Sequence, residues 1–207
     1  MTQPPASGLL ITLEGGEGAG KTTQAKALAS RLEQRGYSVC LTREPGGTEL
    51  GQAVVRLLEE DITPAPLAEL LLFVVDRVQH IRDVIAPALK GAKIVICDRF
   101  TDSTAAYQGY GRGLDLDLIR RLNDEATGGL KPRLTVLLNL PPEVGLSREG
   151  AQSDVTGRET LEFHRRVREG FLALARQEPE RFVIIDATLP AEEVTERTLA
   201  AVDQVLA

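Results

Sequence analysis

The sequence is poor in several residue types that mark particular protein classes. It has no tryptophan, one methionine, two histidines and two cysteines among 207 residues, and aromatic residues make up only 4%. The cysteines, Cys40 and Cys97, each lie in a short apolar run, which predicts buried free thiols rather than a disulfide or a metal site. No apolar run reaches the roughly 20 residues that span a bilayer, and residues 1–8 lack the basic and apolar regions of a signal peptide. These absences predict a cytoplasmic protein with no membrane partner.

The chain also lacks an excess of positive charge. Its net charge is −6, so its overall field would repel nucleic acid rather than hold it. Hydrophobic residues make up 43% and charged residues 26%, which is ordinary for a globular protein. We find no internal repeat, low-complexity tract or linker, and we expect residues 1–207 to form a single domain.

Short apolar runs alternate with amphipathic segments along the whole chain. The predicted strands are Leu9–Leu13, Ser38–Thr42, Lys93–Asp98, Leu134–Leu140 and Phe182–Asp186. The predicted helices are Lys21–Gln34, Glu49–Glu60, Leu67–Leu89, Asp115–Ala126, Pro142–Arg148, Glu159–Gln177 and Ala191–Leu206. Continuous Val, Ile and Leu in the strands favour a parallel sheet covered on both faces. The alternation therefore predicts an α/β fold of three layers, with a five-stranded parallel sheet flanked by helices.

A glycine-rich segment between the first predicted strand and the first predicted helix is the most informative feature. Its residues are Gly15, Gly16, Glu17, Gly18, Ala19, Gly20, Lys21, Thr22 and Thr23. Glycines let backbone N–H groups converge on phosphate oxygens, and the helix N-terminus adds a partial positive charge. Lys21 could reach the terminal phosphates of ATP, and the Thr22 hydroxyl could bind Mg²⁺. The alternative, a glycine-rich turn that matches by chance, does not explain why a strand and a helix flank it.

Two other predicted strands end in polar residues that the sheet would bring to the same edge. Asp98 and Arg99 end the third strand, where Asp98 could hold Mg²⁺ or its water shell and Arg99 could bind phosphate. Alternatively, Asp98 and Arg99 could form an ordinary ion pair on the surface. Arg43 follows the second strand and could bind a second phosphate group, or it could be a solvated arginine of a turn.

The predicted helix Leu67–Leu89 carries an aromatic residue and an arginine on one face. Phe73 and Arg77 are four residues apart, and together they could stack on a flat base and donate to its edge. A partly buried phenylalanine beside a solvated arginine explains the spacing equally well. The apolar residues of this helix form a predicted core stripe, namely Leu67, Leu70, Leu71, Val74, Val78, Ile81 and Ile85.

Hydroxyl and amide side chains follow the Asp98–Arg99 pair. They are Ser103, Thr104, Tyr107 and Gln108. Tyr107 could pack on a sugar and exclude a 2′-hydroxyl, whereas loop packing is the alternative for the whole segment. His80 and His164 lie in predicted helices, and we expect them to be structural.

Several motifs together resemble those of bacterial thymidylate kinases, and they span nearly the whole chain in the family's order. They are Gly15–Thr23, Thr42–Thr48, the Phe73-x-x-Asp-Arg-Val-Gln segment, Asp98-Arg99-Phe100, Ala106–Gly109, the Pro142–Leu146 segment and the Phe163–Arg168 segment. The resemblance implies a P-loop kinase fold, a homodimer, and Mg²⁺-dependent transfer from ATP to dTMP.

The resemblance also implies roles for individual residues. Glu17 would contact the acceptor sugar or the magnesium shell, and Arg43 and Arg99 would hold the acceptor phosphate. Phe73 would stack on thymine while Arg77 donates to its O4 atom. Thr104 would face the base edge, Tyr107 would lie under the deoxyribose, and Asp98 would serve the metal.

The segment at about 145–160 corresponds to the lid of that family. Between Ser147 and Thr160 the only arginines are Arg148 and Arg158, and we expect both to act during transfer. No general base is needed, because a monophosphate oxygen is already largely anionic at neutral pH. Another P-loop nucleoside or nucleotide kinase is one alternative, and a nucleotide-dependent switch ATPase is another.

Overall fold

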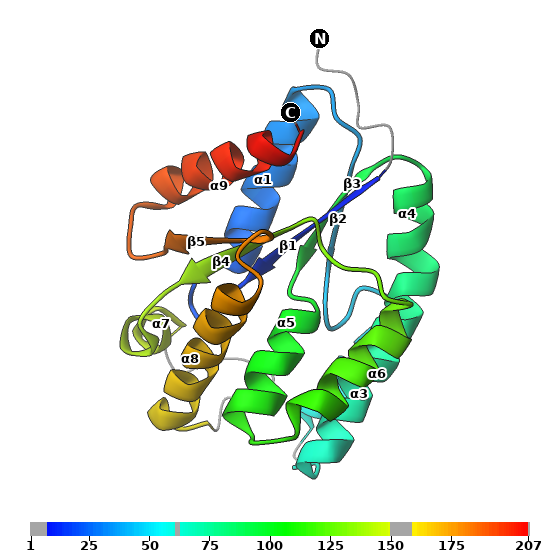
Figure 1. Ribbon diagram of the computed structural model, residues 1–207, viewed down its shortest axis with the longest axis vertical. Helices are drawn as coiled ribbons and strands as arrows, with labels where there is room; N and C mark the ends of the chain where they lie inside the picture. Colours follow the sequence, from blue (N-terminus) through cyan, green and yellow to red (C-terminus); the bar gives the residue numbers. More distant parts are fainter. Residues whose placement is uncertain (1–7, 61–62, 150–158, 207) are drawn as a thin grey trace.

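The sheet is all parallel and has the strand order β2-β3-β1-β4-β5 (Figure 1). We describe it from a computed structural model, which covers residues 8–60, 63–149 and 159–206. The strands are β1 Leu9–Glu14, β2 Val39–Arg43, β3 Ile94–Asp98, β4 Leu134–Asn139 and β5 Phe182–Asp186. All five predicted strands are confirmed, with ends that differ by at most one residue.

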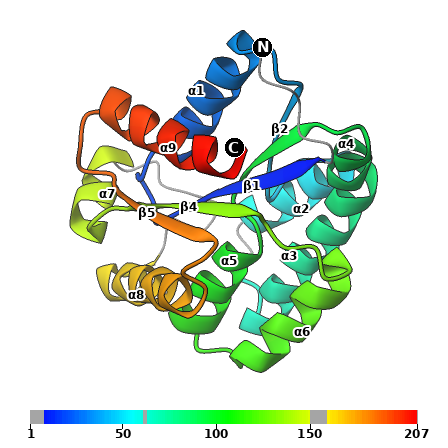
Figure 2. The same ribbon diagram turned by 45° about the horizontal axis from the view of Figure 1, so that its top comes forward.

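Helices cover both faces of this sheet (Figure 2). They are α1 Lys21–Gln34, α2 Glu49–Glu59, α3 Pro66–His80, η1 Ile81–Ile85, α4 Ala86–Lys90, α5 Thr101–Thr104, η2 Ala105–Gly111, α6 Leu116–Thr127, α7 Pro142–Glu149, α8 Leu161–Gln177 and α9 Ala191–Leu206. Within the described ranges, no helix is both long and apolar enough to cross a membrane.

Alternate residues of the central strands face opposite layers. Ile11 and Ile96 belong to a core that α1 and α9 cover, whereas Leu10 and Val95 belong to a core that contains Ile85 and Phe100. All of these side chains are at most 3% exposed. Since strand side chains alternate in direction, runs without polar residues are what a sheet covered on both faces requires.

The predicted helix from Leu67 to Leu89 is divided into α3, η1 and α4. A π-helical turn over Ile81–Ile85 precedes α4, which has Pro87 in its first turn. Proline has no N–H group and its ring crowds the carbonyl four residues earlier, so an unbroken α-helical ladder cannot continue through this point.

The core stripe predicted for this helix is wrong at several positions. Leu67, Leu71 and Val78 are 44–48% exposed, while Arg77 and His80 are buried. The helix therefore turns a polar side toward the rest of the chain and leaves an apolar side uncovered. The physical reason is that α3 forms a wall of a polar cavity instead of covering the sheet.

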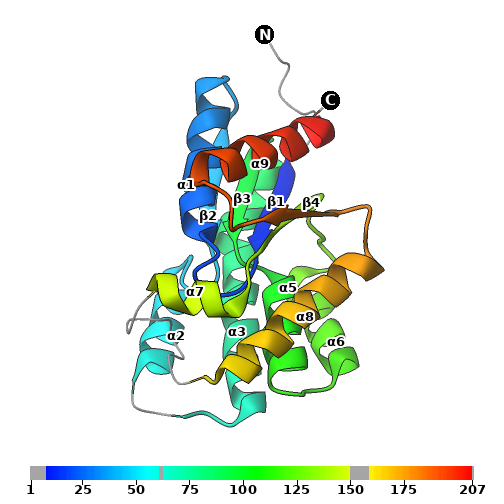
Figure 3. The same cartoon turned by 90° about the vertical axis from the view of Figure 1, so that its left-hand side faces the viewer.

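The segment after β3 is helical rather than a loop. It comprises α5 and η2, which pack beside α8 (Figure 3). Gly109 and Gly111 lie in it, and a Cβ atom at either would approach a neighbouring side chain within 2.7 Å. These glycines weaken the helical pattern in the sequence, yet the packing of η2 requires them.

Candidate active site

The glycine segment between β1 and α1 forms an open phosphate-binding loop. Gly15, Gly18 and Gly20 have φ values of 147°, 64° and 85°, which side chains with a Cβ rarely adopt. Gly20 precedes the first residue of α1 without a side-chain cap, so the first N–H groups of the helix point toward the loop. The arrangement is that of an anion site at a helix N-terminus.

Lys21 is held inside this loop by its own backbone. Its Nζ atom donates to the carbonyl oxygens of Gly15 at 3.1 Å and Gly16 at 2.7 Å. Burial, with a contribution from the positive charge of Arg99, lowers the pKa of Lys21. An ammonium group that is poorly solvated and close to another cation gains when a polyanion enters the loop.

Thr22 and Asp98 meet at the carboxyl ends of β1 and β3. The Thr22 hydroxyl donates to Asp98 Oδ2 at 2.5 Å. Both are oxygen ligands of the kind that Mg²⁺ prefers, and phosphate oxygens and water would complete its shell. Among the described residues, no group of three or more His, Cys, Asp or Glu side chains forms a metal cluster. Two oxygen ligands of this kind fit an Mg²⁺ ion whose other ligands would be phosphate oxygens and water.

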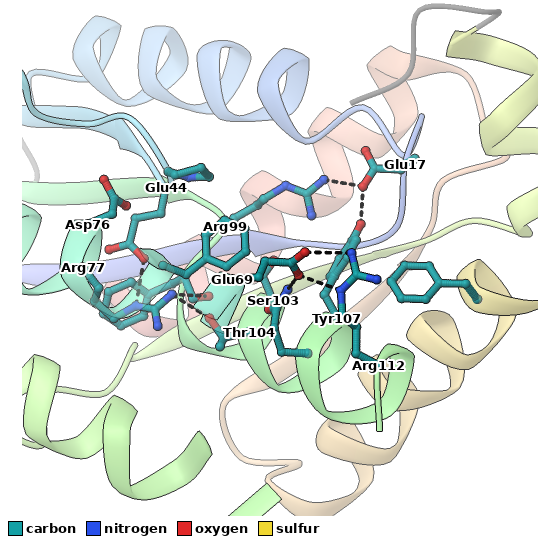
Figure 4. Close-up of a pocket in the computed structure, with 15 residues that line it drawn as sticks. Glu17, Glu44, Glu69, Asp76, Arg77, Arg99, Ser103, Thr104, Tyr107 and Arg112 are labelled. Atoms are coloured by element: carbon teal, nitrogen blue, oxygen red, sulfur yellow. Dashed lines mark hydrogen bonds and ion pairs between the residues drawn. The ribbon is translucent and has the colours of Figure 1, made fainter. Parts of the chain in front are cut away.

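Two cavities meet at this sheet edge. One follows the phosphate loop and is lined by Glu17, Gly18, Gly20, Lys21, Thr22, Thr23, Arg43, Glu44, Pro45, Asp98, Arg99 and Arg148. The other is lined by Glu17, Glu44, Pro45, Glu69, Phe73, Asp76, Arg77, Arg99, Phe100, Ser103, Thr104, Tyr107, Gln108, Arg112 and Phe163 (Figure 4). We call them the loop cavity and the inner cavity. Glu17, Glu44, Pro45 and Arg99 line both, so a group bound in one would lie next to a group bound in the other.

The structure places the predicted substrate residues in two groups. Phe73, Arg77, Arg99, Ser103, Thr104, Tyr107 and Gln108 line the inner cavity. Arg43 instead lines the loop cavity, where its Nε atom donates to Pro45 O at 3.2 Å. Ala19 of the phosphate-binding loop is buried.

Thr48 follows Arg43 in the same motif. Its hydroxyl accepts a hydrogen bond from Gly51 N at 3.0 Å and thereby caps α2, as its residue type favours.

Arg77 is not the solvated arginine that its spacing allowed, because it is only 2% exposed. It donates to Glu44 Oε2 at 2.9 Å, Asn123 Oδ1 at 2.6 Å, Thr104 Oγ1 at 2.9 Å and Phe100 O at 3.2 Å. A guanidinium has five N–H groups, so these four partners leave one, on the nitrogen that donates to Asn123. Glu44 also accepts from His80, which is fully buried and structural as expected.

Glu17, Arg99 and Tyr107 form one contact group at the junction of the cavities. Arg99 donates to Glu17 Oε1 at 2.7 Å, and the Tyr107 hydroxyl donates to the same oxygen. The guanidinium of Arg99 also lies 5.0 Å from the centre of the Tyr107 ring. Burial, followed by the charge of Glu17, raises the pKa of the Tyr107 phenol well above its ordinary value. Tyr107 therefore stays a neutral donor in the physiological range.

Sequence reasoning missed Glu14, which is fully buried at the end of β1. Its carboxyl group accepts from Phe100 N at 2.8 Å and from the Ser103 hydroxyl at 2.6 Å. These bonds fix the turn in which Arg99 has a φ of 68°, an unusual value for a residue other than glycine. Burial, with the charge of Asp102, raises the pKa of Glu14 to about 8. The available signal was a charged residue at the end of an otherwise apolar strand.

The sequence analysis assigns no role to seven residues of the inner cavity wall. They are Glu44, Pro45, Glu69, Asp76, Phe100, Arg112 and Phe163. Burial, followed by the charge of Glu44, raises the pKa of Asp76 to about 6. Asp76 Oδ2 is the one fully buried side-chain oxygen or nitrogen without a hydrogen-bond partner in the part of the chain that the structure describes. The motif that contains Asp76 and Arg77 predicts a role for Arg77 alone.

Arg148 lies on α7, which packs directly against the phosphate loop. A Cβ atom at Gly145 would approach Glu17 O to 2.1 Å, so only glycine allows this contact. The NH1 group of Arg148 donates to Ala187 O at 3.0 Å and to Gly18 O at 3.4 Å. Arg158 lies outside the described residues.

The fold and the site define a class of protein. A parallel sheet that places a phosphate-binding loop after β1 and an acid–arginine pair after β3, beside a second cavity, is the architecture of a P-loop kinase. Comparison with known proteins identifies the family within that class. The family model for thymidylate kinase matches residues 13–198.

Similar proteins agree with the family model. A thymidylate kinase from Synechococcus sp. (strain JA-2-3B'a(2-13)) is 57% identical over 195 residues, which cover 94% of each chain. One from Deinococcus radiodurans is 50% identical and covers 96% of this chain and 98% of its own. The crystal structure of thymidylate kinase from Ehrlichia chaffeensis is 38% identical with a TM-score of 0.79, over 95% of this chain and 99% of that one. The chain belongs to the thymidylate kinase family, and it is a phosphotransferase.

Proposed function

We propose that the loop cavity binds Mg²⁺-ATP, that the inner cavity binds dTMP, and that the γ-phosphoryl group passes between them to give dTDP and ADP. The observation that carries this proposal is the junction of the two cavities at Glu17 and Arg99. Transfer requires the donor phosphate and the acceptor oxygen to lie in line and close together. Two sites that share a wall satisfy this requirement without a large movement of the sheet.

On the donor side, backbone N–H groups of the loop bind the ATP phosphates and Lys21 bridges the terminal ones. Thr22 and Asp98 hold Mg²⁺ or its water shell, and when bound the ion neutralises charge on the phosphates. Arg148 approaches the same phosphates from α7, and Arg158 is proposed to join it from the lid at about 145–160.

On the acceptor side, Arg43 and Arg99 bind the phosphate of dTMP. Tyr107 and Glu17 lie at the sugar, Ser103 lines the wall beside them, and Thr104 faces the base edge. Phe73 stacks on thymine, while Arg77 donates to the ring oxygen that its remaining N–H group can reach. The geometry supports this assignment because these residues, Arg43 excepted, converge on one cavity.

The proposed mechanism uses no general base. The acceptor is a phosphate oxygen that is already anionic, so the protein's contribution is to place two polyanions together and offset their repulsion. Lys21, Arg99 and the lid arginines supply the positive charge, and Arg43 adds to it. Loss of one such contact can cost about 10³-fold in rate.

The test is whether ADP formation depends on dTMP. A coupled assay should show rapid ADP release with ATP, Mg²⁺ and dTMP together, and little release when dTMP or Mg²⁺ is left out. Equal ADP release with and without dTMP would instead identify a hydrolase of ATP, the switch-type alternative. Dependence on a nucleoside without a phosphate would identify a nucleoside kinase.

We also propose that the chain forms a homodimer through the uncovered face of α3. Leu57 and Leu58 of α2 and Leu71, Leu72 and Val75 of α3 line an apolar groove there. Contiguous apolar surface of this kind is typical of protein interfaces. Sedimentation velocity should give twice the 22.4 kDa chain mass, and Val75→Glu should return the protein to one chain mass.

Both thiols, Cys40 and Cys97, are free, which supports the proposal that the enzyme works in the cytoplasm.

A further inference from the structure

Two rows of side chains face each other across the inner cavity. Glu69, Phe73 and Arg77 succeed one another at four-residue spacing on α3, and Thr104 and Gln108 do so on α5 and η2. The rows are joined by two hydrogen bonds, from Arg77 to Thr104 Oγ1 at 2.9 Å and from Gln108 Nε2 to Glu69 Oε1 at 2.7 Å.

Glu69 is held rigidly in this arrangement. It is 3% exposed, and Arg112 donates to both of its oxygens at 2.8 Å. Arg112 also contacts Glu159, at 2.8 Å, and the ring of Phe163, 5.3 Å from its guanidinium carbon. The carboxylate that meets Gln108 therefore has a defined position and little freedom to rotate.

The position of Glu69 determines which way the Gln108 amide faces. A carboxylate paired with an arginine accepts hydrogen bonds and cannot donate them, so it must meet the NH₂ end of the amide. The carbonyl oxygen, Oε1, is then the end that remains. None of the described residues donates a hydrogen bond to Gln108 Oε1, and Gln108 lines the inner cavity. The cavity thus has an acceptor at Gln108, and Arg77, which also lines it, has one further N–H group.

We propose that Glu69 is a positioning residue that sets the base specificity of the inner cavity by fixing the Gln108 amide. The proposal rests on the proposed binding of the base in this cavity. Thymine presents an N–H group at N3 beside a carbonyl group at C4, which matches an acceptor at Gln108 Oε1 beside a donor at Arg77. Cytosine presents an acceptor at N3 beside an amine at C4, so both contacts are mismatched. Without Glu69 the amide can rotate and offer its NH₂ group to cytosine N3.

Glu69→Gln tests this proposal. Glutamine has about the size of glutamate but can donate as well as accept hydrogen bonds, so it no longer fixes which end of the Gln108 amide it meets. The matched control is Glu159→Gln, which alters the other carboxylate on Arg112 and does not touch Gln108. For each variant, kcat/KM would be measured for dTMP and for dCMP, together with the KM for ATP. Glu69→Gln should lower the dTMP-to-dCMP ratio at least about tenfold, with the KM for ATP unchanged, and Glu159→Gln should keep the ratio.

A double-mutant cycle separates positioning from a general structural role. In a Gln108→Ala background, Glu69→Gln should cause no further fall in the ratio. The proposal is overturned if Glu69→Gln lowers kcat/KM equally for both substrates, or if its effect on the ratio persists without Gln108. If the unmutated enzyme shows no preference for dTMP over dCMP, the proposed function itself fails. The kinetics of the unmutated enzyme reveal this before any variant is compared.

A second measurement needs no Glu69 variant. Calorimetric titration of the unmutated protein with dTMP and with its N3-methyl derivative tests the acceptor at Gln108 directly. Methylation removes the N–H group, so binding should weaken at least tenfold, and Gln108→Ala should reduce that penalty. Equal binding of the two nucleotides by the unmutated protein would overturn the proposal.

Discussion

Arg99 at the end of β3 donates to Glu17 of the phosphate loop at 2.7 Å, and this ion pair forms the boundary between the loop cavity and the inner cavity. It joins the carboxyl ends of two neighbouring strands. A ligand phosphate that binds Arg99 would compete with Glu17 for the same guanidinium. The carboxylate of Glu17 therefore lies close to the position that the phosphate of the substrate would occupy.

Arg77→Met should raise the KM for dTMP at least about tenfold and leave the KM for ATP within about twofold. The guanidinium lines only the inner cavity, and methionine cannot donate to the base. Steady-state kinetics with each substrate varied in turn would measure this. Arg82→Met, which alters an exposed arginine five residues further along the chain, is the control. Equal effects on both KM values would place Arg77 outside the base site.

The Tyr107 ring is expected to exclude a 2′-hydroxyl group, so the ribose analogue of dTMP should be a poor substrate. Tyr107→Ala should narrow the difference in kcat/KM between the deoxy and ribo substrates. Tyr107→Phe should keep that difference, because it retains the ring and removes only the hydrogen bond to Glu17. An unchanged difference in the alanine variant would show that another residue selects the sugar.

Loss of Arg148 should lower kcat, since its guanidinium lies beside the loop cavity and would stabilise charge on the transferring phosphate. We expect at least a tenfold fall in Arg148→Ala or Arg158→Ala, equivalent to about 1.4 kcal/mol of transition-state stabilisation. Arg165→Ala, an exposed arginine on α8, serves as the control. If neither variant loses tenfold in kcat, lid arginines do not act in transfer.

Glu14 makes the stability of the protein depend on pH. Its pKa rises from the ordinary value of 4.5 to about 8 on folding, so the folded state binds this proton more tightly than the unfolded state. The free energy of unfolding should therefore fall as the pH rises between about 5 and 8, by at most about 1.4 kcal/mol per pH unit from this group. Urea unfolding of the unmutated protein and of Glu14→Gln across this range would measure it. The variant should lose this part of the slope, and parallel curves would contradict the assignment.

Local patterns in the sequence were sufficient to predict the sheet and the phosphate loop. Each strand is a short apolar run between helices, and the loop motif lies between β1 and α1, so each of these features is encoded in a short stretch of neighbouring residues. Thr48 likewise caps α2 through a partner only three residues away. Features of this kind require no knowledge of the tertiary contacts.

The inner cavity could not be predicted in the same way, because its polar contacts join distant segments. Arg77 is buried through Glu44 and Asn123, which lie 33 and 46 residues away in the sequence. A glutamate in a helix is usually solvated, and only the contacts of Glu69 with Arg112 and Gln108 show that it is buried here. The apolar side of α3 was assigned to the core for a related reason, since periodicity shows that a face is apolar but not what covers it.

The most direct test of the account is the rate of phosphoryl transfer from Mg²⁺-ATP to a panel of monophosphates under identical conditions. The panel would contain dTMP, dUMP, dCMP, dAMP and dGMP, and kcat/KM would be determined for each by coupled ADP release. The account predicts that dTMP is preferred at least a hundredfold over dCMP and over both purine nucleotides, as expected if each of the two base contacts contributes about 1.4 kcal/mol. A preference for any of those three nucleotides, or comparable rates with all of them, would contradict it.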